Sequence, residues 1–192
     1  MTDFDWGEFK LPPVATVGLV DLDLLQLRLP TIGWSEPEPG GVVNSISYRE
    51  PEATDTVAFR KLLNLFGDVF EEPDTYHSRQ PDDQYLRDFL EKQHTITLVA
   101  EAGQEVIGGL VAYVLDKFEQ ERKEIYIYDL GVAEAFRRRG VATRLIRNLQ
   151  KKARSLDAWV VFVQADLVDT PTLRLYESLG KGEEVRHFDI LV

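Results

Sequence analysis

The sequence contains no cysteine among its 192 residues. This absence excludes disulfide bonds, thiolate metal sites and an acyl-cysteine intermediate, and it is typical of proteins in a reducing compartment. No apolar run approaches the roughly 20 residues that a membrane-spanning helix needs. The first ten residues, MTDFDWGEFK, lack the basic and apolar regions of a signal peptide. We therefore expect a cytoplasmic protein that does not bind membranes.

Basic residues are also scarce, with 22 Lys and Arg against 33 Asp and Glu and a net charge of −11. This balance argues against nucleic-acid binding through a general basic face and favours a cationic partner. An ordinary acidic protein has the same balance, so the positions of the charges matter more than their sum. His187 has no second histidine or carboxylate at metal-ligand spacing, and we expect no metal site.

Residues 1–43 differ from the rest of the chain. They contain Pro12-Pro13 and end in the Pro- and Gly-rich stretch 36–41, a composition that interrupts regular structure and marks a linker. A short apolar segment, 19–29, lies within them. We predict an N-terminal extension of unknown role over 1–43, followed by one compact domain over 44–192, which fits a prior of roughly 150 residues per domain.

Hydrophobic periodicity predicts the elements of this domain. The continuous apolar run 159–163 is typical of a fully buried strand. This order of elements indicates an α+β domain with a mixed sheet and helices on both faces. The predicted strands are 45–48, 95–100, 106–114, 124–132, 159–163 and 184–192, and the predicted helices are 54–66, 82–90, 141–156 and 172–179.

A basic loop before the helix 141–156 predicts a phosphate site. Backbone N–H groups at a helix start have no partner inside the helix, and the helix dipole makes that end positive. An anion binds there if the side chains are small enough for close approach. Gly140 and Ala142 are small, and Thr143 adds a hydroxyl.

The charge of this segment supports the same prediction. Eight basic residues and no acidic one occur between Arg137 and Arg154, in a chain with an excess of acids. Such a local inversion favours a phosphate-bearing ligand around 137–142. The alternative, a solvated helix face, fits most of the later basic residues, namely Arg144, Arg147, Lys151, Lys152 and Arg154.

The motif Arg137-x-x-Gly140-x-Ala142 resembles the Q/R-x-x-G-x-G/A loop of the GNAT superfamily of N-acetyltransferases. The resemblance implies the GNAT fold, with a mixed and mostly antiparallel sheet, and acetyl-CoA as the cofactor. The segment 169–180 resembles a second family motif, N-x-x-A-x-x-L-Y-x-x-x-G, from which Asp169 and Thr172 depart. The family match implies these cofactor-binding residues: Leu130, Gly131, Val132, Arg137, Arg138, Arg139, Gly140, Val141, Ala142, Thr143 and Asp169.

Two residues are candidates for the chemistry. Asp129 interrupts an apolar strand at its exit, and a part-buried carboxylate there is a candidate base, although a strand-end aspartate that caps a turn fits the sequence equally well. Tyr176 is the candidate acid by the family match, while its spacing alone favours a core tyrosine. Without a cysteine or a Gly-x-Ser-x-Gly elbow, direct attack by the amine in a ternary complex is the simpler path.

A narrower resemblance covers nearly all of 45–190 and is to the aminoglycoside 3-N-acetyltransferases of the type I group. Its segments include Leu65-Phe66-Gly67-Asp68, the stretch 112–120, the strand 124–130 and His187-Phe188-Asp189-Ile190. It implies acetylation of N3 of the 2-deoxystreptamine ring, antibiotic resistance and a homodimer. The alternatives are a GNAT enzyme acting on a polyamine or a protein amine, and an acyl-CoA-binding regulatory module without turnover.

An acidic stretch agrees with a cationic acceptor. Eight acids and only two arginines lie between Gly67 and Glu91, and acid clusters attract multiply charged cations. A solvated loop and helix face is the alternative for most of these acids individually. The candidate acceptor residues are Asp68, Glu71, Tyr76, Asp166, His187 and Asp189.

Overall fold

The computed structural model describes residues 45–190 and residue 192. The predicted extension over 1–43 lies outside these residues. Most predicted elements are present within a few residues of the expected bounds, and the short helices α2 and η1 are additions. The elements are β1 (Ile46–Arg49), α1 (Thr56–Val69), α2 (Pro73–Tyr76), α3 (Asp83–Glu91), β2 (Thr95–Ala102), β3 (Glu105–Asp116), β4 (Lys123–Val132), η1 (Glu134–Phe136), α4 (Val141–Ser155), β5 (Ala158–Val163) and α5 (Thr170–Glu177).

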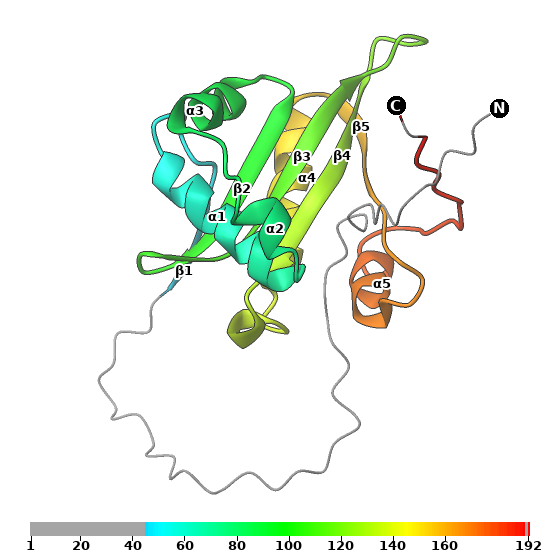
Figure 1. Cartoon of the computed structure of the whole chain (residues 1–192). Helices are drawn as coiled ribbons and strands as arrows, with labels where there is room; N and C mark the ends of the chain where they lie inside the picture. Colours follow the sequence, from blue (N-terminus) through cyan, green and yellow to red (C-terminus); the bar gives the residue numbers. More distant parts are fainter. Residues whose placement is uncertain (1–44, 191) are drawn as a thin grey trace, which may run out of the picture.

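The five strands form one sheet in the order β1-β2-β3-β4-β5 (Figure 1). Neighbours from β1 to β4 are antiparallel, and β4 and β5 are parallel because α4 crosses over between them. The expected mixed and mostly antiparallel sheet is therefore confirmed.

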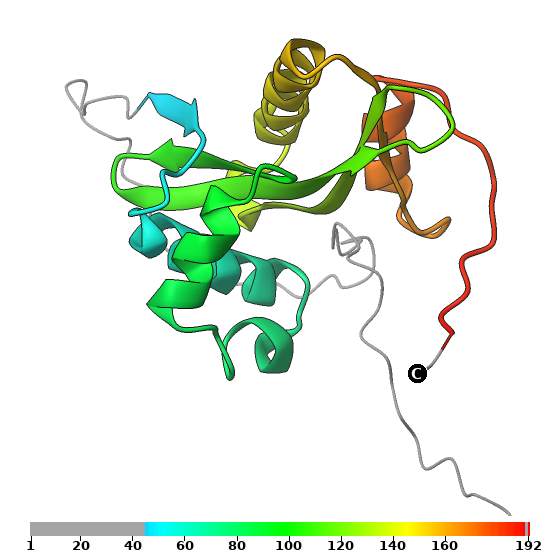
Figure 2. The ribbon, with the colours of Figure 1, turned by 90° about the horizontal axis from the view of Figure 1, so that it is seen from above.

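Helices cover both faces of this sheet, as Figure 2 shows. On one face, Leu145 and Leu149 of α4 are fully buried against Leu110 and Ile125 of the sheet. On the other face, Leu62 and Phe66 of α1 are buried in a separate cluster that includes Leu86 of α3. The apolar stripes that predicted the helices are the faces that make these contacts.

Two glycines allow α1 to approach the sheet closely. A Cβ atom at Gly109 of β3 would lie 2.5 Å from Leu62 Cδ1, and one at Gly131 of β4 would lie 3.0 Å from Phe66 Cδ1. A Cβ atom at Gly109 would overlap its neighbours, and one at Gly131 would require the Phe66 ring to shift slightly. The position of α1 over β4 therefore depends on them.

A β-bulge interrupts β4 at Tyr128. Ile127 pairs with Ala112 and Asp129 pairs with Val111, so Tyr128 is an extra residue without a partner on β3. Strict alternation would place Tyr128 and Asp129 on opposite faces of the sheet. The bulge instead places Asp129 opposite Val111, on the face that carries α1 and on the same face as Tyr126.

The C-terminal prediction was wrong. Residues 181–190 have no regular structure, and Val185, Phe188 and Ile190 are exposed. Figure 1 shows this red segment running apart from the sheet. Alternation of apolar residues is not sufficient for a strand, because its backbone groups also need a neighbouring strand.

The prediction that 159–163 is fully buried was also wrong. Trp159 is 69% exposed and Phe162 is 37% exposed. Only one face of β5 packs against α4, where Val161 and Val163 join the core cluster. The other face carries Val160, 40% exposed, and Phe162, and the α1-side core does not extend over it.

No helix between residues 45 and 190 is long and apolar enough to span a membrane.

We expect Gly109→Ala to destabilise the protein by about 1–3 kcal/mol, because the added methyl group overlaps Leu62 Cδ1 and the carbonyl oxygen of Leu98 at 2.7 Å. The midpoint of urea unfolding measures this change. Gly182→Ala is the matched control, since a Cβ atom at Gly182 meets nothing within 4 Å. Equal midpoints for the two variants would contradict the close packing of α1 on β3.

Candidate active site

The centre of the candidate site is the point where β4 and β5 separate. Their pairing ends at Ile127 and Val163, whereas β4 continues to Val132. Beyond this point the backbone of β4 that faces β5 has no strand partner in the described part of the chain. The split leaves donors and acceptors of the main chain available to a ligand that runs between the two strands.

The predicted basic loop leads directly into α4. Arg138 has φ +58° and Gly140 has φ +78°, and Gly140 is the N-cap of α4 without a side-chain cap hydrogen bond. Left-handed residues within such a loop turn successive N–H groups toward one side and form a concave anion site. The N–H groups of the first turn of α4 add to it. A Cβ atom at Gly140 would meet nothing within 4 Å, so this position needs glycine for its φ and borders open space.

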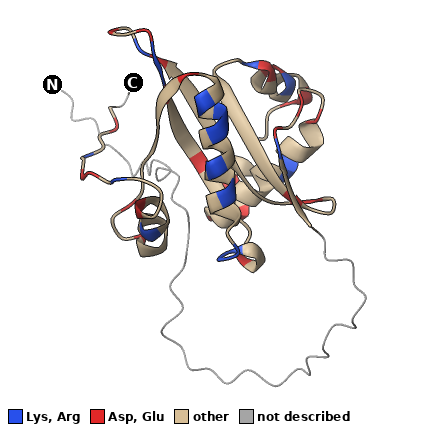
Figure 3. Cartoon of the chain, turned by 180° about the vertical axis from the view of Figure 1, so that it is seen from behind, with Lys and Arg blue, Asp and Glu red and all other residues tan. Residues whose placement is uncertain are grey.

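The three arginines of the loop do not all point at a ligand. Arg137 Nε donates a hydrogen bond to the Val132 carbonyl oxygen at 3.2 Å, which ties the loop to the end of β4. The Arg139 guanidinium lies 5.3 Å from the centre of the Phe136 ring. Arg138 is exposed. The basic residues of α4 form a band along one side of the helix (Figure 3), as the solvated-face alternative predicts.

The other predicted cofactor residues divide between core and surface. The side chains of Leu130, Val132 and Val141 are buried in the α4-side core, so only their main chain is available to a ligand. Ala142 and Thr143 of the first turn are partly exposed. The segment therefore offers mainly its backbone, as a phosphate site at a helix N-terminus requires.

Asp169 has a buried oxygen atom without a partner. Its Oδ1 accepts a hydrogen bond from the Thr172 backbone N–H at 3.1 Å and caps α5, while its Oδ2 is buried and makes no hydrogen bond. A buried acceptor that lacks a donor costs about 1–3 kcal/mol. An N–H group of a ligand would satisfy it. The aspartate thus caps the helix through one oxygen and leaves the other for binding.

Asp129 lies buried on the opposite side of the sheet from α4. It is 8% exposed, and Tyr76 Oη of α2 donates a hydrogen bond to its Oδ1 at 3.3 Å. Burial raises the pKa of Asp129 from 3.8 to about 6, the Tyr76 hydrogen bond opposes this shift, and the negative charge of Glu72 adds to it. A carboxylate with this pKa is ionised at neutral pH and basic enough to accept a proton.

Tyrosine hydroxyls surround Asp129. Burial raises the pKa of Tyr76, Tyr113 and Tyr126, and the negative charge of Asp129 raises the pKa of each further. Of these three phenols, Tyr76 donates a hydrogen bond to the carboxylate, and the other two interact with its charge. The Asp129 side of the site therefore combines neutral phenol groups with the carboxylate of Asp129 and the nearby charge of Glu72.

Tyr176 lies on the other face. It packs with Leu175 and Leu179 of α5 and the following segment against the α4-side core, and burial, followed by the negative charge of Asp169, raises its pKa. It is protonated at neutral pH and is able to donate a proton. Asp129 and Tyr176 thus lie on opposite faces of the sheet, next to the split between β4 and β5.

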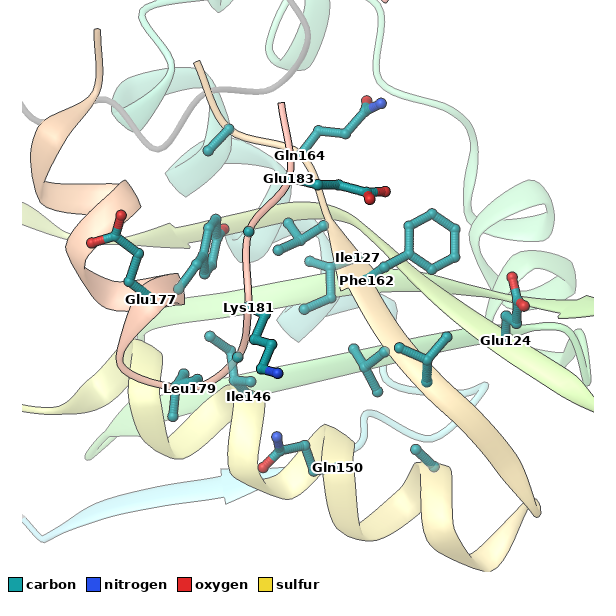
Figure 4. Close-up of a pocket in the computed structure, with 18 of the residues that line it drawn as sticks. Glu124, Ile127, Ile146, Gln150, Phe162, Gln164, Glu177, Leu179, Lys181 and Glu183 are labelled. Carbon is teal, nitrogen blue, oxygen red and sulfur yellow. The ribbon is translucent and has the colours of Figure 1, made fainter. Parts of the chain in front are cut away.

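A cavity of about 890 Å³ lies beside this split, between α4, β5 and the segment that follows α5. Figure 4 shows Ile127 and Gln164 on the sheet side and Ile146 and Gln150 of α4 on the other. Tyr176 lines the cavity, whereas residues 137–143 do not. The cavity therefore adjoins the candidate site on its Tyr176 side. It does not contain the basic loop 137–140, which is called the anion loop below.

Tyr76 is the predicted acceptor residue that the structure brings to Asp129. Asp68 and Glu71 are exposed near α2, with Asp68 Oδ1 3.6 Å from His77 Nε2. Asp166 is exposed in the loop before α5. His187 and Asp189 contact each other at 3.1 Å on the exposed C-terminal segment. The assignment of these last two residues to the acceptor site stays a prediction.

The model of the acetyltransferase (GNAT) family matches residues 59–181. The chain belongs to the GNAT acetyltransferase family. The match includes the anion loop, Asp129 and Tyr176. Groups of three or more side chains that could hold a metal ion do not occur among residues 45–190.

Solved GNAT structures similar to this chain include two from uncultured soil metagenomic samples. The aminoglycoside acetyltransferase HMB0005 is 45% identical with a TM-score of 0.76, and the match covers 77% of this chain and 99% of that one. The aminoglycoside acetyltransferase meta-AAC0020, in complex with sisomicin, is 30% identical with a TM-score of 0.71 and coverages of 77% and 96%.

A curated relative is N-alpha-acetyltransferase 30 of Xenopus laevis, which is 28% identical over 102 residues. These residues are 53% of this chain and 37% of the relative. The chain thus matches little more than a third of the length of that protein.

Sequence reasoning missed Glu72 as a neighbour of Asp129, together with Tyr113, Tyr126 and Tyr128. Glu72 is one of the eight acids of the segment 67–91, and nothing in its sequence surroundings distinguishes it from the other seven. Tyr126 and Tyr128 alternate along the strand that leads to Asp129, which is a usable signal, whereas Tyr113 lies on the neighbouring strand β3. The bulge that brings Asp129 onto the same face as these tyrosines has no sequence signature of its own.

We expect two variants to shift the pKa of Asp129 in opposite directions. Tyr76→Phe removes the hydrogen bond that lowers this pKa and should raise it above about 6, whereas Glu72→Gln removes the charge that raises it and should lower it. Titration of the carboxyl ¹³C NMR signal, assigned with Asp129→Asn, measures both shifts independently of activity. Shifts in the same direction would contradict the described contacts.

Proposed function

We propose that the protein transfers the acetyl group of acetyl-CoA to an amine of an aminoglycoside, by direct attack in a ternary complex. One arrangement carries the proposal. The buried carboxylate of Asp129 and the protonated phenol of Tyr176 lie on the two faces of the sheet, beside the split between β4 and β5. The anion loop lies after the end of β4 and leads into α4. The acetyltransferase class follows from the GNAT family match.

The residues of the split fit coenzyme A. The loop 137–140 and the first turn of α4 would hold its diphosphate through N–H groups, and the exposed Arg138 would add positive charge. The free Asp169 Oδ2 would accept a hydrogen bond from an amide N–H of the pantetheine arm. Main-chain groups of Leu130, Gly131 and Val132 would align that arm along β4. When bound, acetyl-CoA supplies an acetyl group activated as a thioester.

Asp129 has the role of the base. At neutral pH its carboxylate is ionised, and it takes a proton from the ammonium group of the acceptor, either directly or through a water molecule. Tyr76 holds the carboxylate in place through its hydrogen bond. A backbone N–H group near the bulge of β4 stabilises the negative charge that develops on the carbonyl oxygen.

Tyr176 has the role of the acid. Its raised pKa keeps the phenol protonated, so it gives its proton to the sulfur as the carbon–sulfur bond breaks. Tyr176 lies on the α4 side of the sheet, across β4 from Asp129. This arrangement suits a reaction in which Asp129 acts on the amine and Tyr176 acts on the departing sulfur.

Two observations support an aminoglycoside as the acceptor. The similar structures HMB0005 and meta-AAC0020 are aminoglycoside acetyltransferases, and the latter is in complex with sisomicin. The Asp129 side of the site also borders the acidic segment 67–91, which would attract a polycation. We propose N3 of the 2-deoxystreptamine ring as the acetylated position, with antibiotic resistance in the cytoplasm as the outcome. Asp68 and Glu71 would contribute charge at the rim.

The similarity to N-alpha-acetyltransferase 30 favours a protein amine as the second candidate acceptor. A coenzyme A release assay with a panel of aminoglycosides, polyamines and peptides distinguishes these candidate acceptors. We expect turnover with aminoglycosides that contain 2-deoxystreptamine. Turnover with peptides or polyamines only would contradict the acceptor, and no release with any amine would contradict the enzymatic role.

We expect Asp129→Asn to lose activity and gain stability. Removing the base should lower kcat by roughly 10²–10⁴-fold with little change in coenzyme A affinity. The raised pKa means that the folded protein binds this proton more tightly than the unfolded chain, so stability falls as pH rises from about 4 to 6. Removal of the buried charge should therefore raise the free energy of unfolding at pH 7.5 by about 1–3 kcal/mol. Unchanged turnover would remove Asp129 from the mechanism.

We expect Gly140→Ala to weaken coenzyme A binding about tenfold. A residue with a Cβ atom is strained by about 1–2 kcal/mol at φ +78°, and the relaxed loop would no longer present its N–H groups to the diphosphate. Isothermal titration calorimetry measures the change, with Gly182→Ala as the control. Wild-type affinity in Gly140→Ala would contradict the assignment of this loop.

A further inference from the structure

We propose that a row of aromatic rings beside Asp129 is a stacking subsite for a sugar ring of the acceptor, with Tyr128 at its centre. This inference rests on the proposed function and deepens it, because it concerns how the acceptor is recognised. The row crosses β3, β4 and β5 on the face opposite α4 and consists of Phe89, Tyr113, Tyr128, Tyr126 and Phe162.

The rings of the row contact one another in sequence. The Tyr128 ring stands edge to face between Tyr113, at 5.6 Å and 84°, and Tyr126, at 5.9 Å and 83°. Tyr126 stacks on Phe162 at 5.0 Å and 22°. Tyr126 and Tyr128 are two residues apart on β4, so alternation places both on this face, and the bulge then brings Asp129 onto the same face.

The row is open to solvent near the site. Tyr128 is 54% exposed. Phe162 lies beyond the α1-side core, whose described side chains do not cover it. At the other end, Phe89 joins that core, and Lys92 Nζ lies 5.5 Å from the centre of its ring. A cationic ligand would be repelled from the Lys92 end, so the available part of the row is Tyr128, Tyr126 and Phe162.

The polar edge of the row meets the base. The negative charge of Asp129 acts on the Tyr113 and Tyr126 hydroxyls, and Tyr126 Oη donates a hydrogen bond to Gln164 Oε1 at 3.1 Å. The row thus combines apolar ring surface with hydroxyl and amide groups next to a carboxylate. An amino sugar has the complementary chemistry, with C–H groups on its ring face and hydroxyl and ammonium groups at its edge.

This chemistry separates two classes of acceptor. A linear polyamine carries the ammonium groups of an amino sugar without its ring face. The acidic residues attract both classes, but only a saccharide gains from stacking on Tyr128. Cross-strand aromatic pairs also stabilise sheets, and a purely structural row would affect both ligands equally.

The test measures sisomicin acetylation and competitive inhibition by spermine in Tyr128 variants. We expect Tyr128→Ala and Tyr128→Leu to raise KM for sisomicin about tenfold, because both lose the ring face, while the inhibition constant of spermine changes less than about twofold. Tyr128→Phe keeps the ring and should restore the KM for sisomicin. Phe118→Ala is the matched control, because Phe118 is a fully exposed aromatic residue outside the row. Thermal unfolding verifies that each variant is folded.

An unchanged KM for sisomicin in both Tyr128→Ala and Tyr128→Leu would overturn the subsite and leave the proposed function intact. Equal losses for sisomicin and spermine, or a loss in Tyr128→Phe as large as that in Tyr128→Ala, would also overturn it. Absence of sisomicin acetylation by the wild-type protein would overturn the proposed function and the subsite together.

Discussion

The extra residue in β4 is the constraint on which the site depends. Because Tyr128 has no partner on β3, Asp129 lies on the α1 side of the sheet, where α2 supplies Tyr76 and Glu72. Burial at this position raises the pKa of the carboxyl group toward neutrality. A strand with regular pairing would direct Asp129 toward the α4-side core and away from Tyr76 and Glu72.

The split between β4 and β5 complements the bulge. It gives a ligand access to the β4 backbone, while the anion loop and the free oxygen of Asp169 lie at the ends of neighbouring elements. The proposed reaction then places proton acceptance by Asp129 on one face and proton donation by Tyr176 on the other. Burial of the Asp129 charge carries an energetic cost to the fold, which is typical of sites whose groups are tuned for chemistry.

The cavity of about 890 Å³ and the exposed C-terminal segment lie together beside β5. Lys181 and Glu183 of this segment line the cavity, and its apolar residues Val185, Phe188 and Ile190 are solvent-exposed. The homodimer implied by the family resemblance stays a prediction. The same holds for the extension over 1–43, which lies outside the described residues.

Local patterns in the sequence were enough to predict most of the helices and strands and the family. Apolar periodicity located α1, α3 and α4, and the segment 137–142 marked the anion loop, because such patterns report local geometry. The contacts between distant residues, in contrast, depend on how the elements pack. The bulge set the face of Asp129, the short helix α2 brought Tyr76 and Glu72 to it, and the lack of a neighbouring strand left 181–190 irregular. These outcomes depend on contacts between segments distant in sequence, which no local pattern encodes.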